Sequence, residues 1–384
     1  MDSPATARNL VICCDGTSNK FGVTSTNVVR LAEVIDRGGG NQILYYDPGV
    51  GTLPEPGLVG KVSGKVSTLA GLAFGAGLTR NVEEAYGFLM ATWRPGDKVF
   101  LFGFSRGAYT VRVLAGLLHQ LGLLDEGQIN LVPYLLRLFK AIRGKSDQQS
   151  TYWKLCNQFR HTFARPVPGV EQRRFPVHFM GLWDTVSSVG WVWDPKSYPF
   201  TRSNPSVAIA RHAVSLDERR WFFRQNLLTP APGQDLQEQW FAGVHGDIGG
   251  AYPEDEGGLW REAFSWMVRE AVAAGLRVDA DRMHRVLHRT QPPEKPWLEP
   301  QHASLTWYWW PAELFPKLRY VARLKRRLPA LGLGRHRFVA PGSLLHESVL
   351  RRIREMPYAP ANLSPQLIQT IKQLTDVPPN LQVP

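Results

Sequence analysis

The sequence predicts an α/β fold in which a mostly parallel, doubly wound sheet carries helices on both faces. Strand-like and helix-like patterns alternate from residue 9 to about residue 274, which favours one such unit over several separate domains. The chain has 384 residues, of which 43% are hydrophobic, so it is long enough to bury a large core. In the stretch 98–118 an apolar run breaks at a glycine-flanked turn, and a helical pattern follows at once.

The first predicted elements are a strand and a polar turn. Residues 9–13 predict a strand that is apolar from Leu10 on, and the turn Asp15-Gly16-Thr17 precedes a helix that is expected to begin near Asn27. This turn is half of the aspartyl-phosphate motif D-x-D-G-T of phosphatases, but Cys13 stands at the nucleophile position of that motif. We therefore discount phosphatase chemistry. We interpret Asp15 as a carboxylate that fixes the loop, with metal binding as a minor alternative.

The stretch 98–118 is the most informative part of the sequence. Residues 99–102 predict a buried parallel strand, and the apolar residues at 111, 114, 115 and 118 share one face of the helix after it. Between the two elements stands Ser105, in a turn whose Gly103 and Gly107 let the backbone pass close by. A serine at a tight strand-to-helix turn is the context of a nucleophile elbow. The alternative is a serine turn that only packs a helix on a sheet.

A serine nucleophile requires a histidine base and usually a carboxylate that orients this base. In hydrolases with such an elbow the order along the chain is serine, acid, histidine, each on a loop after a strand. The apolar run 176–183 delivers Asp184, and the predicted strand 238–244 delivers His245 into a glycine-rich turn. We therefore predict Ser105, Asp184 and His245 as the catalytic residues, with no metal and no cofactor.

Other residues compete for the roles of acid and base. Asp184 could instead cap the segment after it, in which case Asp194 or Asp247 would orient the base. His119 is expected at the far end of the elbow helix, and His212 lies in 207–216, which we predict as the surface of a helix. Only His245 combines a strand end with glycines that let its loop approach the serine.

The turn after the first strand is the expected source of one oxyanion donor. In α/β-hydrolases this loop donates one backbone N–H, and the residue after the nucleophile donates the other. We assign these donors to Thr17 or Gly16 and to Arg106. Four more residues are expected to support the site: Asp15, Gly103, Gly107 and Asp247.

We predict a catalytic domain at 1–280 and a C-terminal extension at 281–384 that packs on the core. Within the domain, 123–169 is a basic helical stretch at the place where this fold class usually inserts a cap. Beyond Val278 proline and arginine become more frequent and clear strand patterns stop. The extension is therefore expected to be helical.

Cysteine usage and the N-terminal residues bear on where the protein is made. Cys13, Cys14 and Cys156 cannot form a disulfide framework, which favours synthesis in a reducing compartment. The first residues lack the apolar region of a signal peptide, and no uncharged apolar span long enough for a membrane helix occurs. We therefore expect cytoplasmic synthesis, and action outside the cell would require a dedicated secretion machine.

The formal net charge of +12 predicts a surface that attracts anions. No zinc-finger spacing or RNA-recognition motif occurs, so we expect no nucleic-acid partner. The segment 305–328 places the aromatic residues 307–310 before a run of lysines and arginines, a combination that suits peripheral contact with an anionic membrane. The alternative is that these aromatic side chains brace the tail on the core, and helical spacing does not separate the two.

The run 75–112, together with segments along nearly the whole chain, resembles the catalytic domain of type VI secretion phospholipase-like effectors, long labelled a domain of unknown function. Two residues depart from the family pattern: Ser18 stands where a tryptophan is common, and Gly246 where a serine is frequent. These departures bear on substrate identity more than on mechanism. The similar segments are 15–17, 47–52, 183–186, 211–213, 217–219, 241–252, 346–353 and 358–363.

The resemblance implies an α/β-hydrolase fold and a Ser-Asp-His esterase that acts on lipid acyl esters. It also makes export by a type VI system, and an immunity or secretion partner, plausible. We therefore predict a phospholipase A-like serine esterase. The alternatives are an esterase of a nonlipid ester and a noncatalytic protein that binds anionic membranes or nucleic acid.

Overall fold

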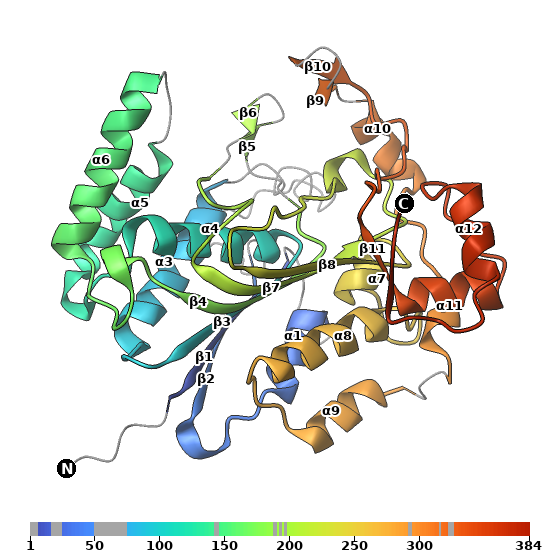
Figure 1. The fold of residues 1–384 in the computed structure, drawn as a ribbon, viewed down its shortest axis with the longest axis horizontal. Helices are drawn as coiled ribbons and strands as arrows, with labels where there is room; N and C mark the ends of the chain where they lie inside the picture. The colour runs from blue at the N-terminus through green and yellow to red at the C-terminus, as the bar shows by residue number, and fades with distance from the viewer. Residues whose placement is uncertain are drawn as a thin grey trace, which may run out of the picture.

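An eight-stranded sheet forms the centre of the protein in the computed structural model (Figure 1). The structure describes residues 7–16, 25–49, 75–141, 146–186, 190–191, 194–195, 198–290, 294–314, 316–321 and 326–384. Seven neighbouring strands of the sheet run parallel, and only β12 pairs antiparallel. The predicted α/β fold is confirmed.

The strand order in the sheet is β12-β11-β8-β7-β4-β3-β1-β2. The strands that carry the predicted catalytic loops, β3, β4 and β8, therefore lie in the middle of the sheet, with β7 between β4 and β8. In chain order the strands are β1 (Asn9–Cys14), β2 (Gln42–Asp47), β3 (Lys98–Phe104), β4 (Val177–Trp183), β7 (Val207–Ser215), β8 (Asp235–Phe241), β11 (Leu344–His346) and β12 (Asn380–Gln382).

Helices cover both faces of the sheet because the central strands are apolar on both sides. On β1, Leu10 and Ile12 belong to one buried cluster, whereas Val11 and Cys13 belong to the other, as the alternation of side chains along a strand requires. The first cluster packs under α3 (Gly75–Thr92) and α4 (Arg106–Leu121). The second packs under α1 (Asn27–Val34), α8 (Trp260–Ala273) and α9 (Ala280–Leu287), on the opposite side in Figure 1.

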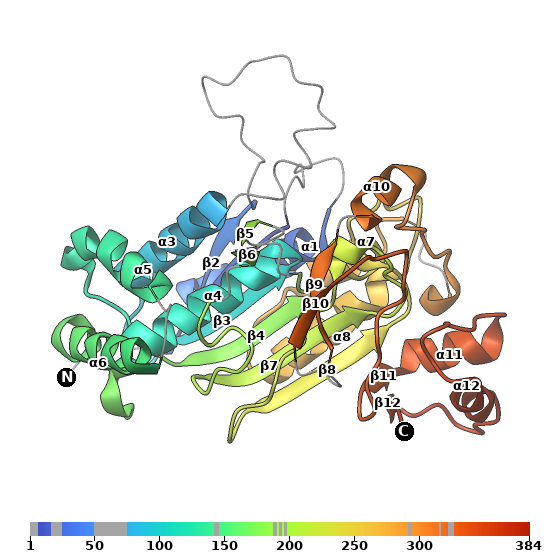
Figure 2. The ribbon, with the colours of Figure 1, turned by 90° about the horizontal axis from the view of Figure 1, so that it is seen from above.

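The predicted insertion and the C-terminal extension lie at opposite ends of the molecule (Figures 1 and 2). The insertion contains α5 (Val132–Lys140) and α6 (Ser146–Phe163), which pack on α3 and α4. Arg160 of α6 donates to the carbonyl of Gln120, near the end of α4 that is remote from Ser105. The division into a domain and an extension stays a prediction, and residues 142–145 lie outside the described part.

The extension departs from its sequence pattern in one respect. It contains α10 (Trp310–Glu313), α11 (Glu347–Glu355) and α12 (Pro365–Lys372), but it also adds β11 and β12 to the edge of the main sheet and forms a hairpin of β9 (Lys317–Val321) and β10 (Arg326–Ala330). Strand β11 has three residues, too few to produce a recognisable alternation, and its pairing with β8 fixes it.

The prediction that 207–216 forms the surface of a helix is wrong. This segment is β7, a strand between β4 and β8 whose residues 210–215 are all buried. Its two central polar residues have partners: Arg211 pairs with Asp235 and Glu270, and His212 bonds to Glu238. A charged side chain that is matched by an ion pair can occupy a central strand, and the apolar alternation is then lost.

Within the described ranges, no helix has both the length and the apolar character that crossing a membrane requires.

Candidate active site

Ser105 lies at a strained turn between β3 and α4. Its backbone has φ 58° and ψ −119°, a conformation that residues other than glycine rarely adopt. The two glycines around it are required by close backbone contacts. A Cβ atom on Gly107 would lie 2.0 Å from the carbonyl oxygen of Cys14, and one on Gly103 would lie 2.5 Å from the backbone nitrogen of Ala108. The turn therefore has the geometry of a nucleophile elbow.

The imidazole of His245 lies between Ser105 and Asp184. Its Nε2 atom is 2.9 Å from the hydroxyl oxygen of Ser105, and its Nδ1 atom is 2.5 Å from Oδ2 of Asp184. His245 is the first residue of α7 (His245–Gly249), and Asp184 directly follows β4. The structure therefore brings the three residues predicted from the sequence together at one edge of the sheet.

Two aromatic rings and the charged carboxylate of Asp184 lie next to the imidazole of His245. The ring centroids of Phe104 and Phe223 lie 4.7 and 4.9 Å from that of the imidazole. Burial lowers the pKa of His245 below its ordinary value, although the neighbouring Asp184 charge opposes this shift. A neutral imidazole with Nδ1–H directed at Asp184 leaves Nε2 able to accept the proton of the serine hydroxyl.

Asp184 is fully buried and has a left-handed backbone with φ 39°. Arg337 of the extension donates to both of its carboxylate oxygens, at 2.5 Å to Oδ1 and 2.9 Å to Oδ2, and the backbone N–H of Ser215 donates to Oδ1 at 2.9 Å. Burial by itself would raise the pKa of Asp184, but the Arg337 charge and the hydrogen bond from His245 outweigh it. The pKa therefore lies well below its usual value, and the carboxylate is ionised.

Asp247, predicted as a supporting residue, stabilises the turn that carries His245. Its Oδ2 accepts the backbone N–H of Val244 at 2.9 Å, and its Oδ1 is 2.6 Å from Nδ1 of His302. These contacts engage both carboxylate oxygens of Asp247. The alternative acid Asp194 lies in β6 (Asp194–Pro195), but its side chain is outside the described part of the structure.

The loop after β1 is held by Asp15. Its carboxylate accepts the hydroxyl groups of Thr26 and Tyr46 at 2.7 and 3.0 Å, as expected for a residue that fixes the loop. The backbone N–H of Gly16 donates to the same carboxylate at 2.6 Å, so in this conformation it is engaged by Asp15. Thr17 lies outside the described residues, and Arg106 opens α4 directly after Ser105.

Sequence reasoning missed Arg337 and Glu218. Glu218 accepts the backbone N–H of His245 at 3.2 Å and forms an ion pair with Arg220, whose guanidinium lies 3.7 Å from the centroid of the Phe223 ring. No spacing signal could have located Arg337, because it is 153 residues from Asp184 and lies in a loop. The sequence did contain a weak signal for Glu218, because this residue belongs to the segment 217–219 of the family resemblance.

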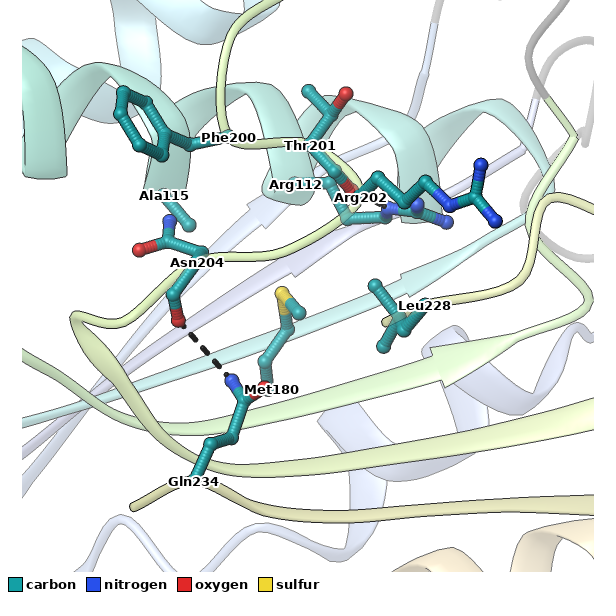
Figure 3. A pocket seen from close by; sticks show the side chains of 9 residues that line it. All are labelled: Arg112, Ala115, Met180, Phe200, Thr201, Arg202, Asn204, Leu228 and Gln234. Carbon is teal, nitrogen blue, oxygen red and sulfur yellow. Dashed lines mark hydrogen bonds between the residues drawn. The ribbon is translucent and has the colours of Figure 1, made fainter. Parts of the chain in front are cut away.

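A small pocket between α4 and the residues around Thr201 is separate from this site (Figure 3). The buried guanidinium of Arg112 bonds there to the backbone carbonyls of Thr201 and Asn226 and to the side chain of Asn226. None of the three predicted catalytic residues lines this pocket. Arg112 therefore ties the elbow helix to the loops above it.

A family model and a known protein are similar to this chain. The family model described as T6SS phospholipase effector Tle1-like, catalytic domain, matches residues 8–270. An uncharacterized protein of Saccharomyces cerevisiae is 34% identical over 236 residues, which are 59% of this chain and 34% of that protein. The chain thus spans about a third of the length of this relative.

Two solved structures are also similar. An uncharacterized protein from Pseudomonas aeruginosa has a TM-score of 0.43 and 17% identity, over 75% of this chain and 49% of that one. A Tle1 effector bound to the VgrG spike of the type 6 secretion system has a TM-score of 0.35 and 18% identity, over 64% of this chain and 52% of that one. The chain spans about half the length of each.

Proposed function

The chain belongs to the family of Tle1-like phospholipase effector catalytic domains, and we propose that it is a serine esterase that cleaves carboxylic ester bonds of phospholipids or similar lipids. Ser105 is the nucleophile, His245 the general base and acid, and Asp184 the residue that orients His245. The observation that carries the proposal is the pair of contacts of His245, one with the Ser105 hydroxyl and one with the buried Asp184 carboxylate.

In the proposed reaction Ser105 Oγ attacks the carbonyl carbon of the ester while its proton passes to Nε2 of His245. The tetrahedral intermediate collapses as His245 returns this proton to the leaving alcohol, which leaves an acyl group on Ser105. A water molecule then attacks the acyl carbon, and His245 takes its proton. The fatty acid departs when Ser105 regains the proton, so the enzyme is unchanged after one turnover.

Asp184 and the backbone around the elbow stabilise the charges that form. The ionised Asp184 compensates the imidazolium that exists when His245 holds the extra proton. We propose the backbone N–H of Arg106 as one donor to the oxyanion, because it follows the nucleophile at the start of a helix. The other donor comes from Gly16 or Thr17, and use of Gly16 requires its N–H to leave the Asp15 carboxylate.

Covalent labelling tests the nucleophile directly. A fluorophosphonate probe is expected to modify Ser105 in the native protein, and peptide mass spectrometry would locate the adduct. The S105A variant serves as the matched control, and heat-denatured protein shows that the label depends on the folded site. Labelling of a different serine, or none, would contradict the assignment.

We also propose that the extension contacts an anionic lipid surface near the site. Trp307, Tyr308 and Leu314 are 83%, 61% and 58% exposed, an unusual cluster for side chains of this kind. The ring of Trp309, between them, packs 5.5 Å from that of Phe223, which contacts His245. The chain carries a net charge of +12, which favours anionic lipid over a neutral surface.

The same segment also braces the fold, so both readings of 305–328 have support. Glu313 is buried and accepts the backbone N–H groups of Trp221 and Gly334. The basic residues Arg323 and Lys325 lie outside the described residues. The exposed side chains of Trp307, Tyr308 and Leu314 and the net charge of +12 support the lipid contact. Hydrolysis of a nonlipid ester is the second candidate, and it would leave these exposed side chains without a role.

Export by a type VI system and an immunity partner are further proposals that rest on family membership. Secretion is tested by whether the protein reaches the culture medium in a strain with an active system and not in one whose system is disabled. An immunity partner would be found as a neighbouring gene product that abolishes the esterase activity. These tests do not depend on the catalytic residues.

A further inference from the structure

Arg337 of the C-terminal extension contacts the carboxylate of Asp184 in the site. It lies in the loop between β10 and β11, and its side chain is only 3% exposed. Besides both oxygens of Asp184, its guanidinium donates to the carbonyl oxygens of Ser215 and Phe223 and to the Ser215 hydroxyl. A planar guanidinium held on both sides in this way fixes the carboxylate in position and orientation.

Other residues of the extension bond to three further carboxylates near the site. His302 bonds to Asp247, Ser304 donates to Glu218 at 2.8 Å, and the Tyr358 hydroxyl donates to Asp217 at 2.7 Å. The carboxylates belong to the loops that follow β4, β7 and β8. The extension therefore bonds to the segments that follow β4, β7 and β8, although the family match ends at residue 270.

The charge of Arg337 bears on the chemistry as well as on the geometry. Asp184 is buried, so its negative charge is screened little and interacts strongly with any cation beside it. Arg337 and a protonated His245 share this one charge. Because Arg337 already compensates the charge of Asp184, protonation of His245 to the imidazolium is less favourable. His245 therefore stays neutral to lower pH.

We propose that Arg337 is a positioning residue: it holds Asp184 at bonding distance from His245 and, by sharing the Asp184 charge, limits how readily His245 takes up a proton. This inference rests on the proposed function. The other titratable or charged groups around His245 are Ser105 on the elbow, Glu218 and Arg220 on the loop after β7, and Asp247 on its own helix. Among the residues that the structure describes, Arg337 is the arginine or lysine that forms an ion pair with Asp184.

The test is the pH dependence of kcat/KM of R337Q with a soluble p-nitrophenyl ester. With the positive charge removed, the acidic limb is expected to move up by about one pH unit. The rate on the alkaline plateau is expected to fall roughly 10- to 100-fold, because Asp184 is less well placed. The matched control is R352Q: Arg352 is a buried arginine of the extension that donates to the carbonyls of Trp297 and Glu299. Its acidic limb should stay at the wild-type position.

A second variant keeps the proposal testable if R337Q does not fold. In D184N/R337Q both partners are neutral, so no buried charge is left unpaired. If Arg337 acts through Asp184, the double variant should have the same kcat as D184N within about twofold, because the two residues work as a unit. An unshifted limb in R337Q, or a further loss of tenfold or more in the double variant, would overturn the proposal. An active S105A variant would instead overturn the proposed function.

Discussion

The hydroxyl oxygen of Ser105 lies 2.9 Å from Nε2 of His245, although 140 residues separate them in the sequence. The two residues follow β3 and β8, which are not neighbours in the sheet because β4 and β7 lie between them. Parallel strands place their carboxyl ends along one edge, so loops from distant parts of the chain meet there. The Asp184 loop, after β4, completes the contact on the other side of the imidazole.

Substitution of the three residues should separate their contributions. S105A and H245A are each expected to lower kcat on a soluble ester by roughly 10^3- to 10^6-fold, because nucleophile and base act as a unit. D184N should cost about 10^4-fold or less, since the nucleophile and base remain. Circular dichroism and the melting temperature serve as controls for folding. Full activity in S105A would contradict the serine mechanism. Full activity in D184N would contradict only the assignment of Asp184 as the acid and would favour Asp194 or Asp247.

The pH profile should reflect the buried position of His245. The base must be neutral to accept the serine proton, so activity is lost as the pH falls through its pKa. Because burial lowers that pKa, the acidic limb of kcat/KM is expected below about pH 6.5, the ordinary value for histidine. The profile is measured with a soluble ester after subtraction of the S105A rate at each pH. A limb centred above pH 7 would be inconsistent with the described surroundings of His245.

Asp217 should make the protein less stable at neutral pH than under mildly acidic conditions. Burial raises the pKa of Asp217 to about 6. The stability that this group contributes is therefore fully present below its unfolded pKa, about 3.9, and is lost as the pH rises through about 6.

Thermal denaturation of D217N at pH 5 and pH 8 checks this expectation. The melting temperatures of the variant at the two pH values should lie closer together than those of the wild type, because the amide does not ionise. Y358F is the matched control, since it keeps the Asp217 carboxylate but removes a donor that favours its charged form. The melting temperature of Y358F should therefore fall more between pH 5 and pH 8 than that of the wild type. If the difference in melting temperature between pH 5 and pH 8 is the same in D217N as in the wild type, Asp217 does not cause the pH dependence of stability.

The exposed side chains of Trp307, Tyr308 and Leu314 should determine binding to lipid surfaces. The variant W307S/Y308S/L314S is expected to bind anionic vesicles roughly 10-fold more weakly or worse, because each side chain would bury apolar area in the interface. Hydrolysis of a soluble ester should not change. The control variant I129S/Y134S removes two exposed apolar side chains of the helical insertion and should bind normally. Undiminished vesicle binding by the triple variant would leave only the bracing role of this segment.

The sequence predicted the elbow and the strands around it because local rules dominate there. The run of 99–102 and the two glycines beside Ser105 produce a strand-turn-helix pattern with no need for distant partners. Asp184 and His245 could be located because each follows a segment whose last residues are apolar, 179–183 and 240–244. Their contact distances depend on the sheet order, which no local pattern contains.

Other features depended on tertiary partners and escaped prediction. Strand β7 carries Arg211 and His212, which look like surface residues until Asp235, Glu270 and Glu238 are found beside them. Strand β11 exists through its pairing with β8. Arg337 has no neighbours in sequence that mark it as important, because its role is defined only by a carboxylate in another part of the chain.

Product analysis with a phospholipid substrate tests whether the protein hydrolyses acyl esters of phospholipids through Ser105. Vesicles of defined phosphatidylglycerol and phosphatidylethanolamine would be incubated with the wild-type protein or with S105A, and the lipids analysed by mass spectrometry. We expect free fatty acid and lysophospholipid in equal amounts with the wild type, and neither above background with S105A. Release of diacylglycerol or phosphatidic acid, or lysophospholipid formation that persists in S105A, would contradict it.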